Sequence, residues 1–173
     1  MAPLYKILLI ILDGFGIGKI PKIDAIAQAK KPFIDHLLKT YPWAAINASS
    51  EDVGLPMGQM GNSEVGHMNI GAGRVVYQEI TCINRSIRMG DFFEKRAFLG
   101  AVDNVTKNNS SLHLIGLLSD GGVHSMNTHL YALLELARRH NLQRVYVHAL
   151  LDGRDTPPEA GINYIRELLD RMK

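Results

Sequence analysis

The sequence holds few of the residues that mark secreted, thiolate-bound or nucleic-acid-binding proteins. Cys82 is its only cysteine, which excludes an intrachain disulfide and a zinc site built from several thiolates. Such sparse cysteine usage is typical of a reducing compartment. Lysines and arginines are spread along the chain, the net charge is +2, and no polybasic run is present. The composition therefore gives no indication of a nucleic acid partner.

The sequence also lacks a hydrophobic stretch long enough to span a membrane. The apolar run Ile7–Leu12 follows Lys6, as in a signal peptide, but it is only six residues long. It ends at Asp13-Gly14 without a small-residue cleavage site, which favours a buried strand over a secretion signal. We therefore expect a cytoplasmic protein without a membrane partner.

Strand-like and helix-like segments alternate along the 173 residues, which predicts an α/β fold with a mainly parallel sheet. Apolar runs predict strands at 5–12, 44–48, 112–118 and 145–151. Amphipathic spacing predicts helices at 23–30, 33–40 (with Pro32 as its first residue), 79–89, 93–107 and 127–140. Thr156-Pro157-Pro158-Glu159 has capping-box spacing with proline at the first position, so a last helix is expected to begin at Thr156.

A glycine-rich segment, Gly58–Gly73, lies between the two halves of this pattern and reads GQMGNSEVGHMNIGAG. It cannot form a continuous amphipathic face, and its glycines allow sharp turns and close approach to a bound group. Ser63, exposed on such a turn, is well placed to act as a nucleophile. The alternative is a glycine-rich loop with an incidental serine, because glycine patterns alone are weak evidence.

Three of the apolar runs are followed by Asp-Gly, at Asp13, Asp120 and Asp152. In open α/β sheets, ligands bind beyond the carboxyl ends of the strands, where a carboxylate suits a metal ion or a polar substrate. Asp-Gly is also a common turn pair, so each instance alone is open to a purely structural interpretation. The threefold recurrence favours a functional one.

The loop after Asp13, which reads GFGIG, resembles a degenerate dinucleotide-binding loop. The fingerprint G-x-G-x-x-G fails there, because Lys19 and Pro21 stand where its last glycine would be. An acid at the strand end would also repel a pyrophosphate. Asp13 better suits a hard divalent cation, which prefers oxygen ligands.

Polar residues follow the other two Asp-Gly pairs. His124 lies in a loop before a predicted helix, which favours contact with a ligand over packing in a core. Arg154 suits bidentate contact with phosphate or carboxylate, and Asp155 can accept hydrogen bonds from substrate hydroxyls. A local Arg154–Asp155 ion pair is the competing interpretation. The remaining histidines, including His67, show no metal-ligand spacing and are expected to pack, cap or face solvent.

Taken together, four ordered blocks resemble the cofactor-independent (2,3-bisphosphoglycerate-independent) phosphoglycerate mutases, relatives of alkaline phosphatase. The blocks are LDGFG at 12–16, GLPMGQMGNSEVGH at 54–67, GGVHS at 121–125 and DGRDTPP at 152–158. The resemblance runs from about residue 4 to the end, with Phe15 where the family more often has tryptophan. It implies an alkaline-phosphatase-like, three-layer α/β fold with mainly parallel sheets, incomplete in this chain.

The resemblance also implies an enzyme that interconverts 3-phosphoglycerate and 2-phosphoglycerate at a site with two divalent metal ions, Mn²⁺ above all, and without 2,3-bisphosphoglycerate. By position, Ser63 forms phosphoserine and contacts a metal ion that Asp13 also binds, while His124, Arg154 and Asp155 hold the substrate. Residues 1–77 would be the first portion of the metal-binding phosphatase-like domain, and residues 78–173 the first portion of the transferase domain. The full-length protein is expected to be a monomer.

Members of this family are considerably longer, and their other manganese ligands and substrate-binding arginines and lysine lie toward the C-terminus. No His/Asp cluster in this sequence replaces those ligands, and no glycine or proline terminates the last predicted helix before Lys173. We therefore expect part of a longer polypeptide that is inactive alone, exposes apolar surface and tends to self-associate. Two alternatives are another metal-dependent phosphomutase or phosphohydrolase of the same superfamily, and a non-enzymatic truncated product.

Overall fold

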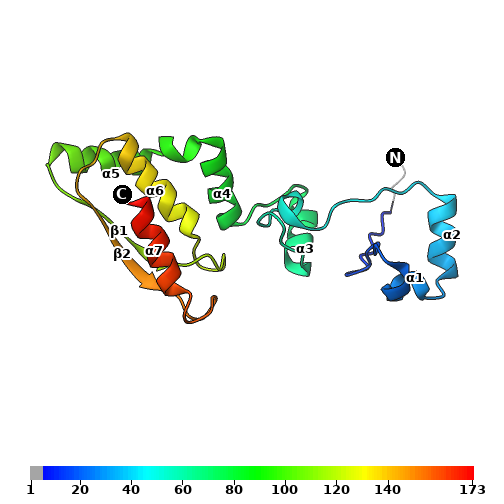
Figure 1. Cartoon of the computed structure of the whole chain (residues 1–173). Helices are drawn as coiled ribbons and strands as arrows, with labels where there is room; N and C mark the ends of the chain where they lie inside the picture. Colours follow the sequence, from blue (N-terminus) through cyan, green and yellow to red (C-terminus); the bar gives the residue numbers. More distant parts are fainter. Residues whose placement is uncertain (1–5) are drawn as a thin grey trace, which may run out of the picture.

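The computed structural model describes residues 6–173, and Figure 1 shows its elements from the N-terminus in blue to the C-terminus in red. The α-helices are α1 Ala25–Gln28, α2 Pro32–Thr40, α3 Ser63–Ala72, α4 Glu79–Met89, α5 Arg96–Lys107, α6 Asn127–Arg139 and α7 Gly161–Arg171. The strands are β1 Leu112–Leu118 and β2 Val145–Leu151, and three short 3₁₀ helices are η1 Pro21–Ile23, η2 Ser50–Val53 and η3 Asp91–Glu94. Helices α4 to α7 gather around the two strands, whereas the elements before them are spread out along the chain (Figure 1).

The sheet seen in residues 6–173 consists of β1 and β2, which pair in parallel from Leu112↔Val145 to Leu118↔Leu151. Both strands have the bounds predicted from the sequence, and α6 connects them as a crossover helix. The expected α/β class and parallel pairing are therefore confirmed. Since the strands run side by side in register, their carboxyl ends bring the loops after Leu118 and Leu151 to the same edge.

One face of this sheet is covered by helices and holds the core. The buried hydrophobic side chains of this part are contributed by η3, α5, β1, α6 and α7, and they are Phe92, Val102, Val105, Leu118, Ala132, Leu136, Ala137 and Leu168. The alternate residues of the strands face the other way. Ile115, Tyr146 and Leu150 are at least half exposed on that face, beside the stacked rings of His113 and His148. The sheet face opposite the helices is thus uncovered within the described part of the chain.

The helix predictions are confirmed most closely at α2 and α4. Helix α2 begins at the expected Pro32 and ends at Thr40, whereas only residues 25–28 of the predicted helix 23–30 form an α-helix, α1. Helix α4 has the predicted bounds, and α6 ends one residue early. The predicted helix 93–107 is divided, because Phe93 belongs to η3 and α5 begins only at Arg96. The helix expected from Thr156 begins at Gly161 instead, since residues 158–160 form a turn in which the Ala160 N–H donates to the Pro157 carbonyl, 2.9 Å away.

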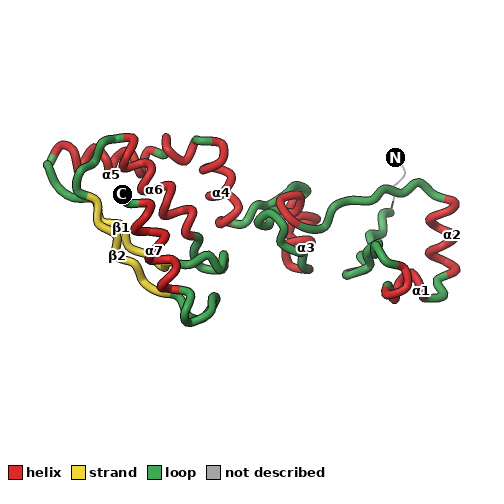
Figure 2. The backbone as a smooth tube through the Cα atoms, viewed as in Figure 1, coloured by secondary structure: helices red, strands yellow, loops and turns green. Residues whose placement is uncertain are grey.

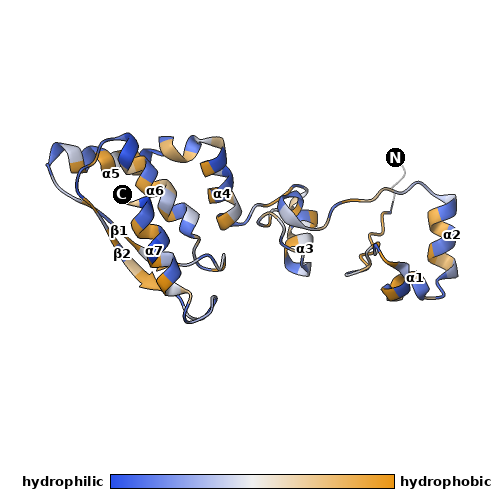
Figure 3. Cartoon of the chain, viewed as in Figure 1, coloured by the Kyte–Doolittle hydropathy of each residue, from blue (hydrophilic) through white to orange (hydrophobic). Residues whose placement is uncertain are grey.

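Two strand predictions in the N-terminal part are wrong. Residues 6–12 and 44–48 have no regular secondary structure, and Tyr5 lies outside the described residues. Ile7 is 92% exposed and Ile46 is 89% exposed, so neither segment is buried. Figure 3 colours the chain by hydropathy, with the hydrophobic residues in orange. A parallel strand needs a hydrogen-bonded neighbour and a cover on its faces, and residues 6–173 provide neither for these segments. Figure 2 shows them as loop.

The expectation that Ser63 lies on a sharp turn of the glycine-rich segment is also wrong. Residues 63–72 of this glycine-rich segment form α3, and only Val65 in it is buried. The helix has no apolar face to bury, as its sequence indicated, and it is instead anchored through polar contacts. The Asn69 side chain accepts from the Val76 N–H at 2.8 Å and donates to the Val53 carbonyl at 3.0 Å. These bonds tie α3 to η2 and to the segment that leads into α4.

Ion pairs then connect η2 to the packed part of the molecule. Glu51 in η2 receives the Arg88 guanidinium in a fork of two 2.8 Å hydrogen bonds, and Arg85 adds a third at 3.2 Å. Both arginines lie on α4, which packs on α6. The hydrogen bonds from Arg88 hold the pKa of Glu51 below its usual value.

Across residues 6–173, every helix is too short or too polar to cross a lipid bilayer.

Candidate active site

Ser63 is the first residue of α3. The preceding residue, Asn62, caps the helix, because its side-chain oxygen accepts the Val65 N–H at 2.9 Å. The Ser63 side chain is therefore held at the amino end of a ten-residue helix. The sequence had suggested a sharp turn instead. The free N–H groups and the dipole at this end favour negative charge.

Glycine is required in the loop that leads to Ser63. A Cβ at Gly61 would lie 1.6 Å from the Ala48 carbonyl oxygen, so no larger residue fits without moving the backbone. The same loop is held by the Ser50 N–H, which donates to the Gln59 carbonyl at 2.8 Å, and by the Gly58 N–H, which donates to the Ser50 hydroxyl at 3.0 Å. The glycine-rich sequence thus serves a close backbone approach that fixes where α3 begins.

Asp13 is brought to Ser63 from fifty residues away. It occupies a turn in which the Phe15 N–H donates to the Leu12 carbonyl at 3.0 Å, and Gly14 has a φ of +77°, which glycine adopts freely. The Ser63 hydroxyl donates to Asp13 Oδ2 at 2.5 Å. The turn interpretation of this Asp-Gly pair is therefore confirmed, and the contact with Ser63 agrees with the functional interpretation, which stays a prediction.

His67 joins this contact, although the sequence gave it no functional role. It lies one helical turn after Ser63, and its Nδ1 is 2.8 Å from the Ser63 carbonyl oxygen and 3.2 Å from the Ser63 hydroxyl oxygen. A carbonyl oxygen only accepts, so Nδ1 carries the hydrogen, and a neutral ring leaves Nε2 with its lone pair free. His67 can therefore orient Ser63 but cannot take its proton through Nδ1. The i, i+4 spacing of Ser63 and His67 on a helix was the signal for this contact.

Asp13 and Ser63 offer adjacent oxygen atoms on an exposed surface. Oxygen donors of this kind suit a hard divalent cation. In the described residues, however, no three side chains of His, Cys, Asp or Glu are grouped as a metal site. The residues present therefore fit part of a metal centre, and further ligands would have to come from outside this segment.

The second group of candidate residues lies at the carboxyl ends of β1 and β2. His124 and Asp155 come from the loops after the two strands, and His124 Nε2 is 3.8 Å from Asp155 Oδ2. The His124 side chain is 65% exposed and that of Asp155 is 14% exposed. The His124 loop is fixed by the Ser125 hydroxyl, which donates to the Leu117 carbonyl at 2.5 Å. The structure thus brings together two of the three residues expected to hold substrate.

Arg154 lies in the same loop as Asp155 and is exposed. Among the described residues, its guanidinium has no carboxylate oxygen within 4.0 Å, so the alternative of a local ion pair with Asp155 is wrong. A guanidinium without an internal partner keeps all its donors for a ligand.

Asp152 carries the polar network beneath these residues. Its carboxylate is buried, and Oδ1 accepts the N–H groups of Gly153, Arg154 and Asp155 at 2.7, 2.9 and 3.1 Å. Oδ2 accepts the Ser119 hydroxyl at 2.6 Å. The sequence singled out Asp152 only as a strand-end acid, and Ser119 not at all. An aspartate followed by three non-proline residues is compatible with this pattern of bonds but does not by itself identify the role.

These bonds lower the pKa of Asp152. The hydrogen bond from Ser119 is the largest cause and those from the Arg154 and Asp155 amides follow, so its pKa falls from 3.8 to about 2. A carboxyl group with a depressed pKa stabilises the folded chain above its unfolded pKa, and this contribution is lost as the pH falls through the folded value.

We expect the midpoint of urea unfolding to decrease between about pH 4 and pH 2, in part through Asp152. Glu135, whose pKa is also about 2 through its bonds with Arg138 and Arg139, contributes in the same window. The contribution of Asp152 is separated from that of Glu135 by comparing three proteins. These are the unmodified chain, Asp152→Asn, which removes the charge, and the control Asp103→Asn at an exposed position. The Asp152→Asn chain should show a shallower pH dependence. If the urea midpoint changed equally with pH in all three proteins, Asp152 would have the same pKa in the folded and the unfolded chain.

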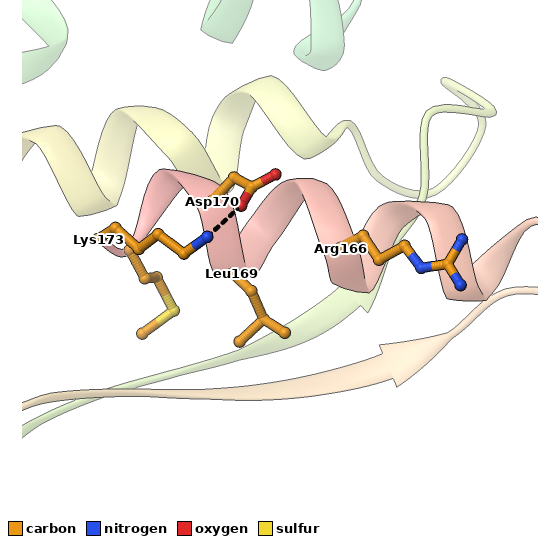
Figure 4. Close-up of a pocket in the computed structure, with 5 residues that line it drawn as sticks. Arg166, Leu169, Asp170 and Lys173 are labelled. Atoms are coloured by element: carbon orange, nitrogen blue, oxygen red, sulfur yellow. Dashed lines mark hydrogen bonds and ion pairs between the residues drawn. The ribbon is translucent and has the colours of Figure 1, made fainter.

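Two hollows accompany these groups. One of 340 Å³ adjoins His124 and is lined by the start of α4, the His124 loop and α6, through Gln78, Glu79, Ile80, Ile83, Val123, His124, Ser125 and His129. Burial lowers the pKa of His129, whose Nε2 is 2.7 Å from Asn84 Oδ1. The other, of 570 Å³, lies at the end of α7, where Figure 4 shows Lys173 bonded to Asp170 at 2.7 Å. It contains none of the candidate residues.

The Ser63 group and the His124 group lie in different parts of the molecule. Asp13 and Ser63 belong to the extended N-terminal portion, whereas the loops after β1 and β2 lie at the edge of the packed portion (Figure 1). Of the three aspartates that follow predicted strands, Asp120 and Asp152 lie at one sheet edge, whereas the segment before Asp13 forms no strand within the described residues.

Fold and site together describe part of an α/β protein with a serine–carboxylate site and a separate polar, arginine-bearing site. The family described as "BPG-independent PGAM N-terminus (iPGM_N)" matches residues 83–173, more than half of the chain. The chain belongs to the 2,3-bisphosphoglycerate-independent phosphoglycerate mutase family. This agrees with the resemblance seen in its sequence motifs.

Individual relatives extend the match to nearly the whole chain. It is 59% identical to the 2,3-bisphosphoglycerate-independent phosphoglycerate mutase of Acetivibrio thermocellus over 167 residues, which cover 96% of this chain and 33% of that protein. It is 57% identical to mutase 1 of Methanosarcina barkeri over 162 residues, covering 94% of this chain and 31% of that protein. The chain therefore spans about a third of the length of these curated relatives.

A solved structure supports the same fold. The phosphoglycerate mutase of Leishmania mexicana, determined at low cobalt concentration, is 39% identical, with a TM-score of 0.61. The match covers 93% of this chain and 30% of that one. The expected α/β fold of a phosphoglycerate mutase, present here only in part, is thus confirmed.

Proposed function

We propose that this chain is the N-terminal part of an enzyme that interconverts 3-phosphoglycerate and 2-phosphoglycerate through a phosphoserine intermediate at Ser63. One observation carries the proposal: in this member of the family, the Ser63 hydroxyl lies at the amino end of α3 and donates a hydrogen bond to Asp13. The substrate is a small phosphorylated acid. The proposal includes neither a nucleic acid nor a membrane partner, and it places the protein in the cytoplasm, where glycolytic substrates are found.

The position of Ser63 suits a transient phosphate carrier. A phosphoryl group on its oxygen would stand at the N-terminus of α3, where free N–H groups and the helix dipole stabilise an anion. The Asp13 carboxylate, 2.5 Å from Oγ, favours removal of the hydroxyl proton. His67 Nδ1 lies 3.2 Å from the same hydroxyl oxygen and helps to orient it. Asp13 thus favours deprotonation of the nucleophile, and His67 orients it.

Asp13 and Ser63 would be ligands of a divalent metal ion, and we propose a two-metal site with Mn²⁺ as the preferred ion. Bound metal supplies charge stabilisation for phosphoryl transfer and favours the serine alkoxide. Because the described residues hold no group of three metal-binding side chains, the other ligands are assigned to the remainder of the longer enzyme. We accordingly propose that the 173-residue chain is inactive by itself.

The second site would hold glycerate while the phosphoryl group resides on Ser63. Arg154 offers a forked donor to a carboxylate or phosphate, and Asp155 and His124 offer contacts to hydroxyl groups. A mutase requires such a holder, because the glycerate must stay bound, reorient and accept the phosphoryl group on its other hydroxyl. Residues 1–77 are thus assigned to the phosphatase-like domain and residues 78–173 to the transferase domain. The complete enzyme is proposed to be a monomer.

The proposal is tested with a chimaera in which residues 1–173 replace the matching segment of the Acetivibrio thermocellus mutase, which is 59% identical. With Mn²⁺, the chimaera should convert 3-phosphoglycerate to 2-phosphoglycerate at a rate comparable to the parent enzyme, and the 173-residue chain alone should not. A folded chimaera without mutase activity, beside an active parent, would contradict the proposal. Turnover by the chain alone would contradict its assignment as an incomplete site.

The same chimaera separates the mutase from a related metal-dependent phosphohydrolase or phosphomutase. A panel of phosphorylated sugars and acids should show a clear preference for phosphoglycerate. Equal turnover of the whole panel, with release of inorganic phosphate, would favour the rival activity.

A further inference from the structure

The structure assigns to Asp152 the role of positioning residue for the glycerate-holding side chains, through the backbone of Arg154 and Asp155 and through Ser119. This inference rests on the function proposed above for Arg154 and Asp155. Asp152 would not touch the substrate. It would fix where the two neighbouring side chains stand, and it would couple their loop to the loop of His124.

The first support is the set of three consecutive amides. A single oxygen of Asp152 accepts the N–H groups of Gly153, Arg154 and Asp155, which orients the backbone at all three residues. Arg154 is exposed and makes no ion pair within residues 6–173, so no side-chain contact of that kind holds its guanidinium. The direction in which Arg154 leaves the backbone therefore depends on the carboxylate beneath it.

The second support is the link through Ser119. This side chain is 1% exposed, donates to Asp152 Oδ2 at 2.6 Å and accepts the Gly121 N–H at 3.0 Å. Its carbonyl accepts the Asn127 N–H at 2.8 Å, at the start of α6. Ser119 thus holds both ends of the loop that carries His124.

The two loops are also in close contact at Gly121. A Cβ at this position would lie 3.1 Å from Asp155 Cβ and 3.2 Å from the Ser119 hydroxyl oxygen, so only glycine leaves room for this approach without a shift. The polar chain from Asp152 to Ser119 to Gly121 therefore links the same two loops that carry His124 and Asp155, whose side chains are 3.8 Å apart. Movement of Asp152 would displace residues of both loops together.

A positioning role predicts a specific chemical defect. When glycerate is held poorly, it leaves before accepting the phosphoryl group, and water can attack the phosphorus of phosphoserine instead. The bond between phosphorus and the Ser63 oxygen then breaks, the serine oxygen regains a proton, and inorganic phosphate and glycerate are released. The fraction of turnovers that ends in hydrolysis therefore reports how well the holder is positioned.

The test compares Asp152→Ala, Ser119→Ala and Asp152→Asn in the active chimaera. Asp152→Ala should lower kcat/KM for 3-phosphoglycerate by about 10- to 100-fold, the scale expected for misplaced substrate-binding groups, with KM raised and more inorganic phosphate released per turnover. Ser119→Ala should change both quantities in the same direction. Asp152→Asn keeps a carbonyl oxygen for the three amides and should recover most of the loss. Asp103→Ala, at an exposed site on α5, is the control.

A folded Asp152→Ala chimaera with unchanged kcat/KM and unchanged release of inorganic phosphate would overturn the inference. An equal loss of kcat in the alanine and asparagine variants, with no change in product partition, would also overturn it, since that result indicates a general loss of structure. If Asp152→Ala does not fold, kcat/KM and the release of inorganic phosphate are compared between Ser119→Ala and Asp152→Asn, and the same criteria apply.

A measurement on the 173-residue chain separates this inference from the proposed function. The amide protons of Gly153, Arg154 and Asp155 should exchange slowly with solvent and become fast in Asp152→Ala, whether or not the chimaera is a mutase. Unchanged exchange would refute the positioning role. Fast exchange in the variant combined with an inactive unmodified chimaera would instead refute the proposed function and leave the loop contacts established.

Discussion

Replacement of Ser63 with alanine in the chimaera is expected to lower kcat for mutase activity by at least about 1000-fold, the scale seen when a covalent nucleophile is removed. The variant loses the only oxygen that could carry the phosphoryl group at the N-terminus of α3. The helix itself should persist, because its cap comes from Asn62 and not from Ser63. The measurement is the initial rate of 2-phosphoglycerate formation, together with rapid quenching and mapping of a phosphorylated residue.

Ser49→Ala provides the matched control for this experiment. Ser49 precedes η2 near the same loop, is exposed and makes no side-chain capping bond. It should leave the rate unchanged, and phosphate should be mapped to Ser63 in this variant as in the unmodified chimaera. Normal mutase activity in Ser63→Ala, or phosphate on another residue, would show that the proposed mechanism is wrong.

Replacement of Arg154 with alanine is expected to lower kcat/KM for 3-phosphoglycerate by about 100- to 1000-fold, as for the loss of a charge-assisted, forked contact. The loop should keep its conformation, because Asp152 accepts from the backbone amide of Arg154 and not from its side chain. Arg154→Lys should recover only part of the loss, since a lysine ammonium cannot reproduce the fork. Steady-state kinetics with both substrates would measure these effects.

Arg166→Ala is the control for Arg154. Arg166 lies on α7, is exposed and borders the hollow in Figure 4 rather than the candidate site. Its removal should leave kcat/KM unchanged. If Arg154→Ala and Arg166→Ala behaved alike, Arg154 would have no role in holding the substrate.

These expectations differ in what supports them. The family membership and the assignment of Ser63, Asp13, His124, Arg154 and Asp155 came from sequence motifs, and the comparisons confirm the family. The roles of the individual residues stay predictions. The contact between Asp13 and Ser63, and that between His124 and Asp155, are findings of the structure that agree with those assignments.

The residue roles that the sequence did not reveal were missed for a common physical reason. His67, Ser119 and Asp152 act through short-range geometry, such as one helical turn or three successive amides, and not through an unusual residue type. A serine or aspartate at a strand end is compatible with many turns, so its partner is decided only when the backbone is placed. Ser119 and Asp152 are 33 residues apart, and this spacing does not predict the hydrogen bond between them.

The sequence by itself determined the family, the two parallel strands and the helices α2 and α4, because apolar periodicity and specific motifs are local properties of the chain. Tertiary structure decided the rest. The apolar run at residues 6–12 reads as a buried strand, yet it stays exposed, since strand formation requires hydrogen-bonding neighbours that residues 6–173 do not supply. Likewise, Ser63 became the first residue of a helix, because the Asn62 cap and the contacts of Asn69 stabilise a segment that has no apolar face of its own.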